Sequence, residues 1–178
     1  MDVHAGGAGA RLLVEVGDSS GTTTFEELYR RNFAAVVGLV YALSGNRHVA
    51  EELAQEAFLA AHRGWDRVGG YDDPGAWVRR VAVNQAVSAL RRRSAEARTL
   101  LRLSGPRALP EPLPDDADAF WRAVRQLPTR QAQAIALHYL EDRSVKDIAA
   151  VLECAEATVR VHLHRGRQAL AATLGEEA

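Results

Sequence analysis

The stretch 144–174 constrains the fold more than any other part of this 178-residue sequence. Its apolar residues recur at i, i+3, i+4 and i+7 on either side of a short break, which predicts two helices that each bury one face. The segments are a helix over 144–152, a turn over 153–155 and a longer helix over 156–174. Ser144 and Asp147 have the spacing of a capping pair at the first helix start. A short helix, a tight turn and a longer helix with a basic outer face form the helix-turn-helix arrangement.

In such a unit, the first two turns of the second helix face base edges in the major groove of DNA. The outward residues predicted here are Ala157, Val161, His164 and Gln168, flanked by Thr158, Arg160 and Arg165. The same pattern also suits a helical hairpin in an ordinary bundle, with a solvated basic face. This stretch alone leaves both interpretations open.

Charge is distributed unevenly along the chain, although the net charge is only −1. Residues 1–56 hold four Arg against eight acids, a balance of −4, whereas residues 74–102 hold seven Arg against Glu96, a balance of +6. The contents of 47% apolar and 25% charged residues are ordinary for a globular protein with one or two small domains. The asymmetry predicts one surface for a basic partner and another for phosphate.

Several functional classes are disfavoured by what the sequence lacks. The single cysteine, Cys154, excludes an internal disulfide and a cysteine-rich zinc site, and its place in the turn favours a small apolar filler. No 18-residue apolar run and no secretory signal are present, so we expect no membrane insertion and a reducing, cytoplasmic setting. There is no phosphate-binding glycine loop, metal cluster or nucleophile motif, so we expect neither an enzyme nor a cofactor or metal.

The first half of the chain reads as a tail followed by helices. Residues 1–23, rich in Gly, Ala, Ser and Thr, predict a disordered tail. Thr24 and Glu27 form a capping box for a helix that ends at Gly45. The next helix runs from about Asn46 to His62, and its polar face carries Glu51, Glu52, Gln55 and Glu56. That acidic face is either simply solvated or a dock for a basic protein surface.

The segment 64–73 reads as a loop because of its glycines, and it contains two aromatic residues, Trp65 and Tyr71. Aromatic rings in such a loop can stack on an unpaired base. Alternatively, Trp65 anchors the loop to the core. Pro74 then begins a helix that extends to Arg93.

One side of this helix carries amides, a hydroxyl, guanidiniums and an aromatic ring at helical spacing. The residues are Trp77, Asn84, Gln85, Ser88, Arg91 and Arg92, with Arg79 and Arg80 on the flanks. Such a strip can hold both phosphates and base edges. An arginine run that simply ends a solvated helix is the alternative for its last turn.

Four of the six prolines lie between Pro106 and Pro114, which predicts an extended linker that keeps two domains apart. Beyond it, a short helix over 120–126 and a helix from Pro128 join the helix-turn-helix as a four-helix domain. We therefore expect an all-α fold of two small helical domains. The predicted boundaries are a tail 1–23, a first domain 24–95, a linker 96–117 and a second domain 118–178.

These motifs, in this order, resemble the extracytoplasmic-function (ECF) class of bacterial RNA polymerase sigma factors, and the match runs from Phe25 to Leu174. Residues 50–58 look like that family's core-polymerase-binding helix. Residues 77–84 with 90–93 look like its promoter-melting helix. Residues 127–128 and 164–170 look like parts of its domain that reads the −35 element.

The resemblance implies a transcription initiation factor whose partners are core RNA polymerase and promoter DNA. It implies core polymerase binding by Glu51, Glu52, Leu53, Gln55, Glu56 and Phe58. It implies −10 DNA binding by Trp65, Tyr71, Trp77, Arg79, Arg80, Asn84, Ser88, Arg91 and Arg92. It implies −35 DNA binding by Glu156, Ala157, Thr158, Arg160, Val161, His164 and Arg165. In this family an anti-sigma factor often clamps the two domains together.

The chain departs from the family pattern at four positions. Ser88 stands where the family usually has Asp, and Glu153, Ala155 and Ala157 replace the usual Gly, Ser and Gly of the turn. Ala155 cannot cap a helix as serine does, and the missing cap lowers stability by about 1 kcal/mol. Glu153 must adopt a turn conformation that glycine adopts more easily. A degenerate sigma factor that occupies polymerase without reading promoters is therefore one alternative, and a dimeric helix-turn-helix repressor is another.

Overall fold

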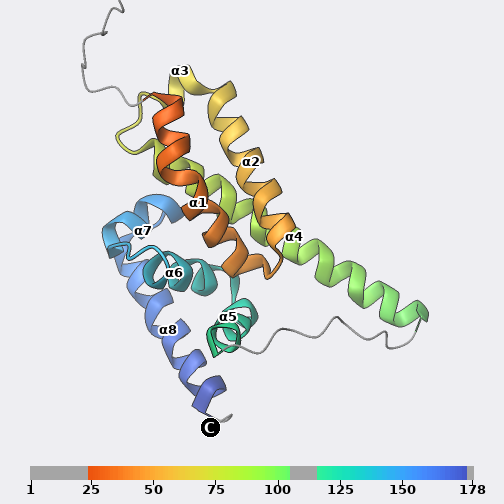
Figure 1. The fold of residues 1–178 in the computed structure, drawn as a ribbon. Coiled ribbons are helices and arrows are strands. Elements are labelled where there is room, and N and C mark those ends of the chain that lie inside the picture. The colour runs from red at the N-terminus through yellow and green to blue at the C-terminus, as the bar shows by residue number, and fades with distance from the viewer. Residues whose placement is uncertain (1–23, 105–115, 176–178) are drawn as a thin grey trace, which may run out of the picture.

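A computed structural model describes residues 24–104 and 116–175, and within these ranges the chain forms eight helices and no strand. The helices are α1 (Phe25–Ser44), α2 (Arg47–Arg63), α3 (Trp65–Val68), α4 (Pro74–Ser104), α5 (Asp116–Gln126), α6 (Thr129–Tyr139), α7 (Val145–Leu152) and α8 (Glu156–Gly175). Figure 1 shows them as two groups, α1–α4 and α5–α8, in contact with each other. The predicted all-α class is confirmed.

Local side-chain chemistry sets both ends of α1. The Glu27 amide donates to the Thr24 hydroxyl at 3.3 Å, and the Thr24 amide donates to the Glu27 carboxylate at 3.2 Å, so the predicted capping box is present. Gly45 ends the helix with φ 67°, a left-handed conformation that costs glycine little. The Asn46 side chain then accepts a hydrogen bond from the Val49 amide at 3.0 Å and begins α2.

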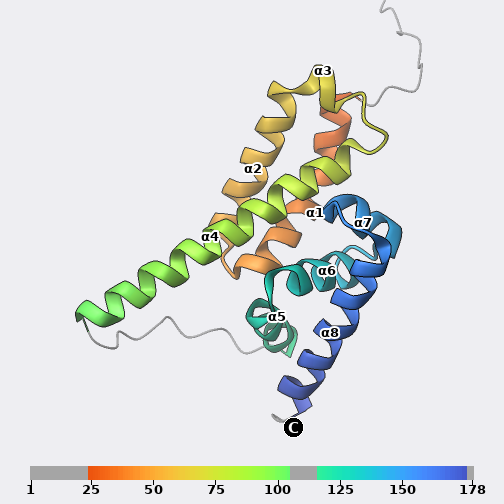
Figure 2. The ribbon, with the colours of Figure 1, turned by 180° about the vertical axis from the view of Figure 1, so that it is seen from behind.

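The first half is a bundle in which α1, α2 and α4 pack pairwise. Its core side chains have almost no exposed surface: Val36, Leu39 and Val83 are 0% exposed, and Phe58 is 1% exposed. Burying each such side chain contributes about 1.5–3 kcal/mol, which more than offsets weak intrinsic helix propensity. In Figure 2, α4 lies across both α1 and α2.

The second half contains the predicted helix-turn-helix. The Asp147 amide donates to the Ser144 hydroxyl at 3.1 Å, and the Ser144 amide donates to the Asp147 carboxylate at 3.3 Å. This capping box begins α7, and Glu153 ends it with φ 49°, the left-handed conformation that the sequence predicted for a non-glycine residue. The apolar stripe of α8 is buried through Val159, Leu163, Gly166 and Leu170.

Gly166 allows α8 to approach α6 closely. A Cβ atom built at this position would lie 2.9 Å from Cγ1 of Ile135, which is itself fully buried. Only glycine, which has no side-chain carbon, permits this contact. The glycine therefore sets how closely α8 packs on α6.

The structure corrects the predicted linker. Residues 96–104 continue α4, which runs to Ser104, and α5 already begins at Asp116. The reason is compositional: residues 94–104 contain Ala, Glu, Arg and Leu, which favour helix, and the prolines begin only at Pro106. The remaining linker residues 105–115 and the predicted tail 1–23 lie outside the described residues.

Two further expectations are also changed. The segment 64–73, predicted as a loop, contains the one-turn helix α3, which begins after Gly64. The two halves, which we expected the linker to keep apart, are packed together: α4 contacts α7, and α1 contacts both α5 and α6. One cluster of buried apolar residues consequently runs through both halves.

We expect Gly166→Ala to lower the free energy of unfolding by about 1 kcal/mol, because overpacking against Ile135 costs about 1–3 kcal/mol and exceeds the helix propensity gained. Urea denaturation followed by circular dichroism measures the change. Gly175→Ala is the matched control, since nothing lies within 4 Å of its Cβ position. Equal or greater stability of Gly166→Ala would contradict the close contact of α6 and α8.

Candidate nucleic-acid and polymerase interfaces

The outer face of α8 presents all seven residues predicted to bind −35 DNA. They are exposed: Glu156, Ala157, Thr158, Arg160, Val161, His164 and Arg165. Nη2 of Arg160 lies 2.8 Å from Oε2 of Glu156, one helical turn earlier, and both side chains stay accessible. Because the opposite face is buried on α6 and α7, this face is free to enter a groove.

The turn before α8 is built without the usual side-chain cap. Ala155 has no hydroxyl, and its carbonyl accepts the Thr158 and Val159 amides at 2.9 and 3.2 Å. The Cys154 amide donates to the Ala149 carbonyl at 3.1 Å, and the half-buried cysteine packs against the core, as expected of a small filler. Backbone hydrogen bonds and packing thus place the first turn of the recognition helix.

His162 lies on the partly buried side of α8 and differs in character from the exposed His164. Burial, together with the positive charges of Arg130 and Arg165, lowers the pKa of His162 below its usual value. The lowered pKa favours the neutral imidazole of His162 over the charged form. Among the described residues, no group of His, Cys, Asp and Glu could hold a metal ion.

The polar stripe of α4 is only partly accessible. Asn84 and Ser88 are exposed, and the Ser88 hydroxyl donates to the Asn84 carbonyl at 3.0 Å, one turn back along the helix. Trp77 is half-buried against the core. Arg91 and Arg92 belong to α4, but their side chains lie outside the described residues.

The two flanking arginines of α4 are held by carboxylates from the second half. Arg79 is 4% exposed, and its Nε donates to Oε2 of Glu141 at 2.6 Å. Arg80 forms an ion pair with Glu153, the residue that ends α7. In this arrangement Arg79 is not accessible to DNA. The sequence did not indicate that this side chain is buried.

The aromatic residues of segment 64–73 have different surroundings. The Trp65 ring meets the Phe25 ring edge-on with centroids 5.5 Å apart, and a Cβ at Gly69 would lie 3.0 Å from the indole. This packing is that of an anchor, the second of the two interpretations that the sequence left open. Tyr71 is 38% exposed and is the accessible aromatic of the segment.

The predicted acidic face of α2 is accessible and partly neutralised. Arg47 Nε donates to Glu51 at 2.9 Å, and His48 lies 3.3 Å from Glu52, while Gln55 and Glu56 are exposed. The two apolar members of the predicted polymerase surface lie in the core instead: they are Leu53, 9% exposed, and Phe58, 1% exposed. Leu53 therefore packs inside the bundle, whereas Phe58, although almost fully buried, also lines a hollow between α1 and α2.

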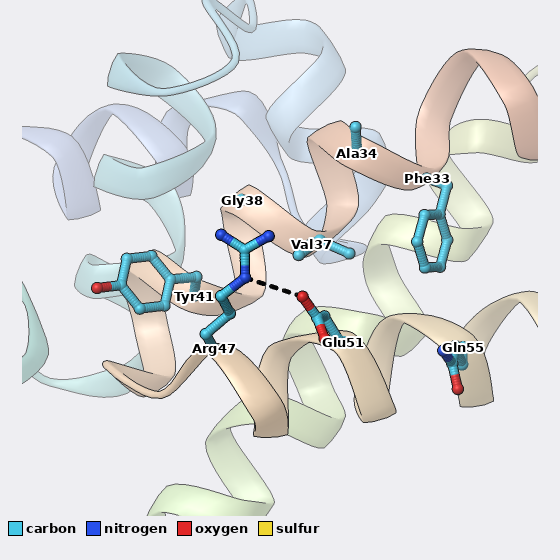
Figure 3. Close-up of a pocket in the computed structure, with 8 residues that line it drawn as sticks. All are labelled: Phe33, Ala34, Val37, Gly38, Tyr41, Arg47, Glu51 and Gln55. Carbon is cyan, nitrogen blue, oxygen red and sulfur yellow. Dashed lines mark hydrogen bonds and ion pairs between the residues drawn. The ribbon is translucent and has the colours of Figure 1, made fainter.

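A furrow between α1 and α2 lies beside this acidic face and was not found from the sequence. One hollow of about 660 Å³ is lined by Phe33, Ala34, Val37, Gly38, Tyr41, Arg47, Glu51 and Gln55, as Figure 3 shows. A second of about 410 Å³ is lined by Phe25, Tyr29, Gln55, Phe58, Leu59 and His62. Gln55 lines both, so the two hollows are neighbours between α1 and α2, and we refer to them together as the furrow. The aromatic repeat at 25, 29 and 33 was the signal available in the sequence.

The family comparisons agree with this division into two halves. The Sigma-70 region 2 family matches residues 28–96, and the Sigma-70 region 4 family matches residues 117–170. A core-binding and −10 domain followed by a helix-turn-helix domain defines the class: the protein is a sigma factor, a transcription initiation factor that directs RNA polymerase to promoters. Sigma factors bind core polymerase and promoter DNA, and the polymerase carries out the catalysis.

The chain belongs to the ECF RNA polymerase sigma factors. It is 31% identical to the ECF sigma factor SigM of Mycobacterium tuberculosis over 85% of this chain and 77% of that protein. It is 32% identical to SigE of Mycolicibacterium smegmatis over 91% of this chain, which spans 66% of that protein. A solved complex of the sigma factor RpoE with the anti-sigma factor NepR from Bartonella quintana has the same fold, with a TM-score of 0.67 at 24% identity over 85% of this chain and 96% of that one.

No helix among the described residues combines the length and apolar character needed to span a bilayer.

We expect Ser144→Ala to raise the pKa of Asp147 and to weaken the start of α7. The Ser144 hydroxyl, which donates to the Asp147 carboxylate at 2.7 Å, is the main cause that holds the pKa of that carboxyl below 3.8. Loss of the cap should lower the free energy of unfolding by about 1 kcal/mol at neutral pH.

The pH dependence of this effect has a definite sign. The folded pKa of Asp147 lies below the unfolded value near 3.8. The ionised carboxylate therefore contributes to the free energy of unfolding above that value, and this contribution is lost as pH falls through the folded pKa. The difference in free energy of unfolding between the wild type and Ser144→Ala should therefore become smaller in acid. NMR titration of Asp147 and urea denaturation at several pH values test this, with Thr173→Ala, which lies inside α8, as the control. An unchanged Asp147 titration would contradict it.

Proposed function

We propose that this sigma factor reads the −35 element as duplex with α8, holds the opened −10 strand with α4 and the 64–73 segment, and binds core polymerase through α2 and the furrow. The observation that carries the proposal is the face of α8. All seven predicted −35 residues are accessible on one helix whose opposite stripe is buried. Such a helix can enter the major groove without disturbing its own core.

The −10 part of the proposal rests on the exposed α4 residues Asn84 and Ser88, with Tyr71 as the accessible ring. An amide and a hydroxyl can contact base edges, and a tyrosine ring can stack on an unpaired base. Arg79 and Arg80 would add phosphate contacts once released from their carboxylate partners.

The polymerase part rests on the acidic face and the adjoining furrow. Glu51, Glu52, Gln55 and Glu56 form the rim, and the furrow supplies apolar area for the centre of an interface. Apolar centres with a charged rim are the usual anatomy of such contacts, and the rim charges steer association with a basic partner. The protein would then act in the cytoplasm with polymerase and promoters, and a regulatory anti-sigma factor, as in the solved relative, is part of the proposal.

We expect Arg160→Ala and Asn84→Ala to impair promoter use at different steps. Loss of a base contact by Arg160 should weaken recognition of the −35 duplex by about 1–3 kcal/mol. Loss of Asn84 should reduce strand opening, read as permanganate reactivity, while binding to the duplex stays unchanged. Transcription with purified core polymerase measures both.

Arg167→Ala is the matched control on α8, since Arg167 donates to the Tyr139 hydroxyl at 2.8 Å and lies outside the predicted reading face. If Arg160→Ala and Asn84→Ala both leave promoter selection intact while the polymerase contact matters, the chain occupies polymerase without reading promoters. That result would contradict the promoter-binding roles of Arg160 and Asn84 and would favour a degenerate sigma factor.

We expect Glu52→Gln to slow association with core polymerase several-fold at low salt, because rim charges act mainly on the association rate. The difference should shrink at high salt as the charges are screened. Glu26→Gln, which removes another exposed charge from the first turn of α1, should leave association unchanged. Equal rates for the two variants would remove the acidic face from the interface.

A further inference from the structure

A carboxylate lies on the face of α8 that the proposed function places against DNA. Glu156 is the first residue of α8, and 45% of its side chain is exposed. Because every phosphate of DNA carries a negative charge, an unpaired carboxylate on this face would be repelled from the groove. Glu156 is compatible with DNA binding only if a nearby positive charge offsets its own.

Arg160 provides that positive charge. Its Nη2 atom donates to Oε2 of Glu156 at 2.8 Å, the length of a charge-assisted hydrogen bond. The two residues are four positions apart, and the carboxylate lies nearer the start of the helix, which is the favourable order for such a pair. The Arg160 side chain stays 61% exposed, so the pair leaves the guanidinium accessible to a ligand.

The local structure of α8 holds the carboxylate of this pair in place. Glu156 is the acidic residue of the first turn, where the positive end of the helix dipole attracts a negative charge. The backbone of that turn is fixed by Val159, which is 0% exposed and whose amide donates to the Ala155 carbonyl at 3.2 Å. Glu156 therefore restrains the more flexible arginine, rather than the reverse.

A guanidinium held in this way can still bind a base. Arginine has five N–H donors in a fixed fork, and the bond to Glu156 uses one of them. A bidentate contact of arginine with O6 and N7 of guanine is the commonest specific contact in the major groove. Restraining a long side chain before binding also reduces the entropy that is lost when it contacts its ligand.

The neighbouring side chains leave the contact with guanine to Arg160. It is the only arginine in the first two turns of α8, the part of a recognition helix that contacts base edges. Ala157 and Val161 are exposed and apolar, so they can contact a thymine methyl group but cannot donate to a guanine. The direction of one guanidinium therefore decides which base pair this part of the helix selects.

We propose that Glu156 is a positioning residue for Arg160: it does not bind DNA itself, but directs the Arg160 guanidinium to one guanine of the −35 element. The inference rests on the proposed function, because it takes α8 as the helix that enters the major groove. A carboxylate beside phosphates weakens binding to every sequence, whereas an oriented arginine strengthens binding to one. Loss of Glu156 should therefore reduce selectivity without reducing the affinity for DNA in general.

The test uses the full chain with core polymerase and duplex promoter DNA in which each −35 base pair is replaced in turn by the other three. The variants are Arg160→Ala, Glu156→Ala and the double variant. Asp142→Asn is the matched control, since it removes an exposed carboxylate from the same half of the chain at a φ of 50° that asparagine tolerates. Competition binding gives the affinity for each duplex, and for one that lacks a −35 element.

We expect Arg160→Ala to abolish the preference for guanine at one position, a preference of about 5-fold to 150-fold. Glu156→Ala should reduce the preference at that same position several-fold, and should not lower the affinity for the duplex that lacks a −35 element. The double variant should behave as Arg160→Ala does, because Glu156 acts through Arg160. Asp142→Asn should leave the preference unchanged.

Three outcomes overturn the positioning role while the proposed function stands. They are an unchanged preference in Glu156→Ala, an equal loss of affinity for all duplexes, and a change at a position different from the one that Arg160 selects. The last would make Glu156 a DNA contact in its own right. If Arg160→Ala alters the preference at no −35 position, the proposed reading of the duplex by Arg160 fails as well, so the two failures are distinguishable.

Discussion

The buried ion pair between Arg79 and Glu141 is the contact on which the arrangement of the two halves depends. A charge removed from water must be paired, and a pair formed across an interface fixes the relative position of the elements that carry it. Gly75 leaves room for the guanidinium over the first turn of α4, and Asn32 supplies a second acceptor from α1.

The turn of the helix-turn-helix unit links DNA reading to this interface. Glu153 ends α7 in a left-handed conformation, where glycine would be less strained, and its carboxylate pairs with Arg80. Glu153, which replaces the family's usual glycine at a strained position, thus forms an ion pair with Arg80 in the structure. Because α8 begins three residues later, the same turn both precedes α8 and contacts α4.

Local signals predicted the helix boundaries well, because they depend on neighbouring residues. Thr24 with Glu27 and Ser144 with Asp147 formed the expected capping boxes, and Gly45 and Glu153 ended helices as expected. The length of α4 was missed because proline position was given more weight than the helix propensity of residues 94–104.

Long-range contacts could not be predicted from the same signals. Arg79 and Glu141 are 62 residues apart, and nothing in either neighbourhood marks them as partners. Leu53 and Phe58 entered the predicted polymerase surface through the family resemblance, although their own helical periodicity places them on the buried face of α2. The furrow depends on two helices meeting, so its aromatic repeat gained meaning only when α1 and α2 were packed.

The most direct test of the account is the distance between the two halves, measured by energy transfer between labels at Arg63→Cys on α2 and Lys146→Cys on α7, with Cys154 replaced by alanine. Both labelled positions are exposed and lie outside the proposed contact residues. The account predicts a short distance in the free protein and an increase of several tens of ångströms when polymerase and promoter DNA are added. An unchanged short distance in a complex that initiates transcription would contradict it.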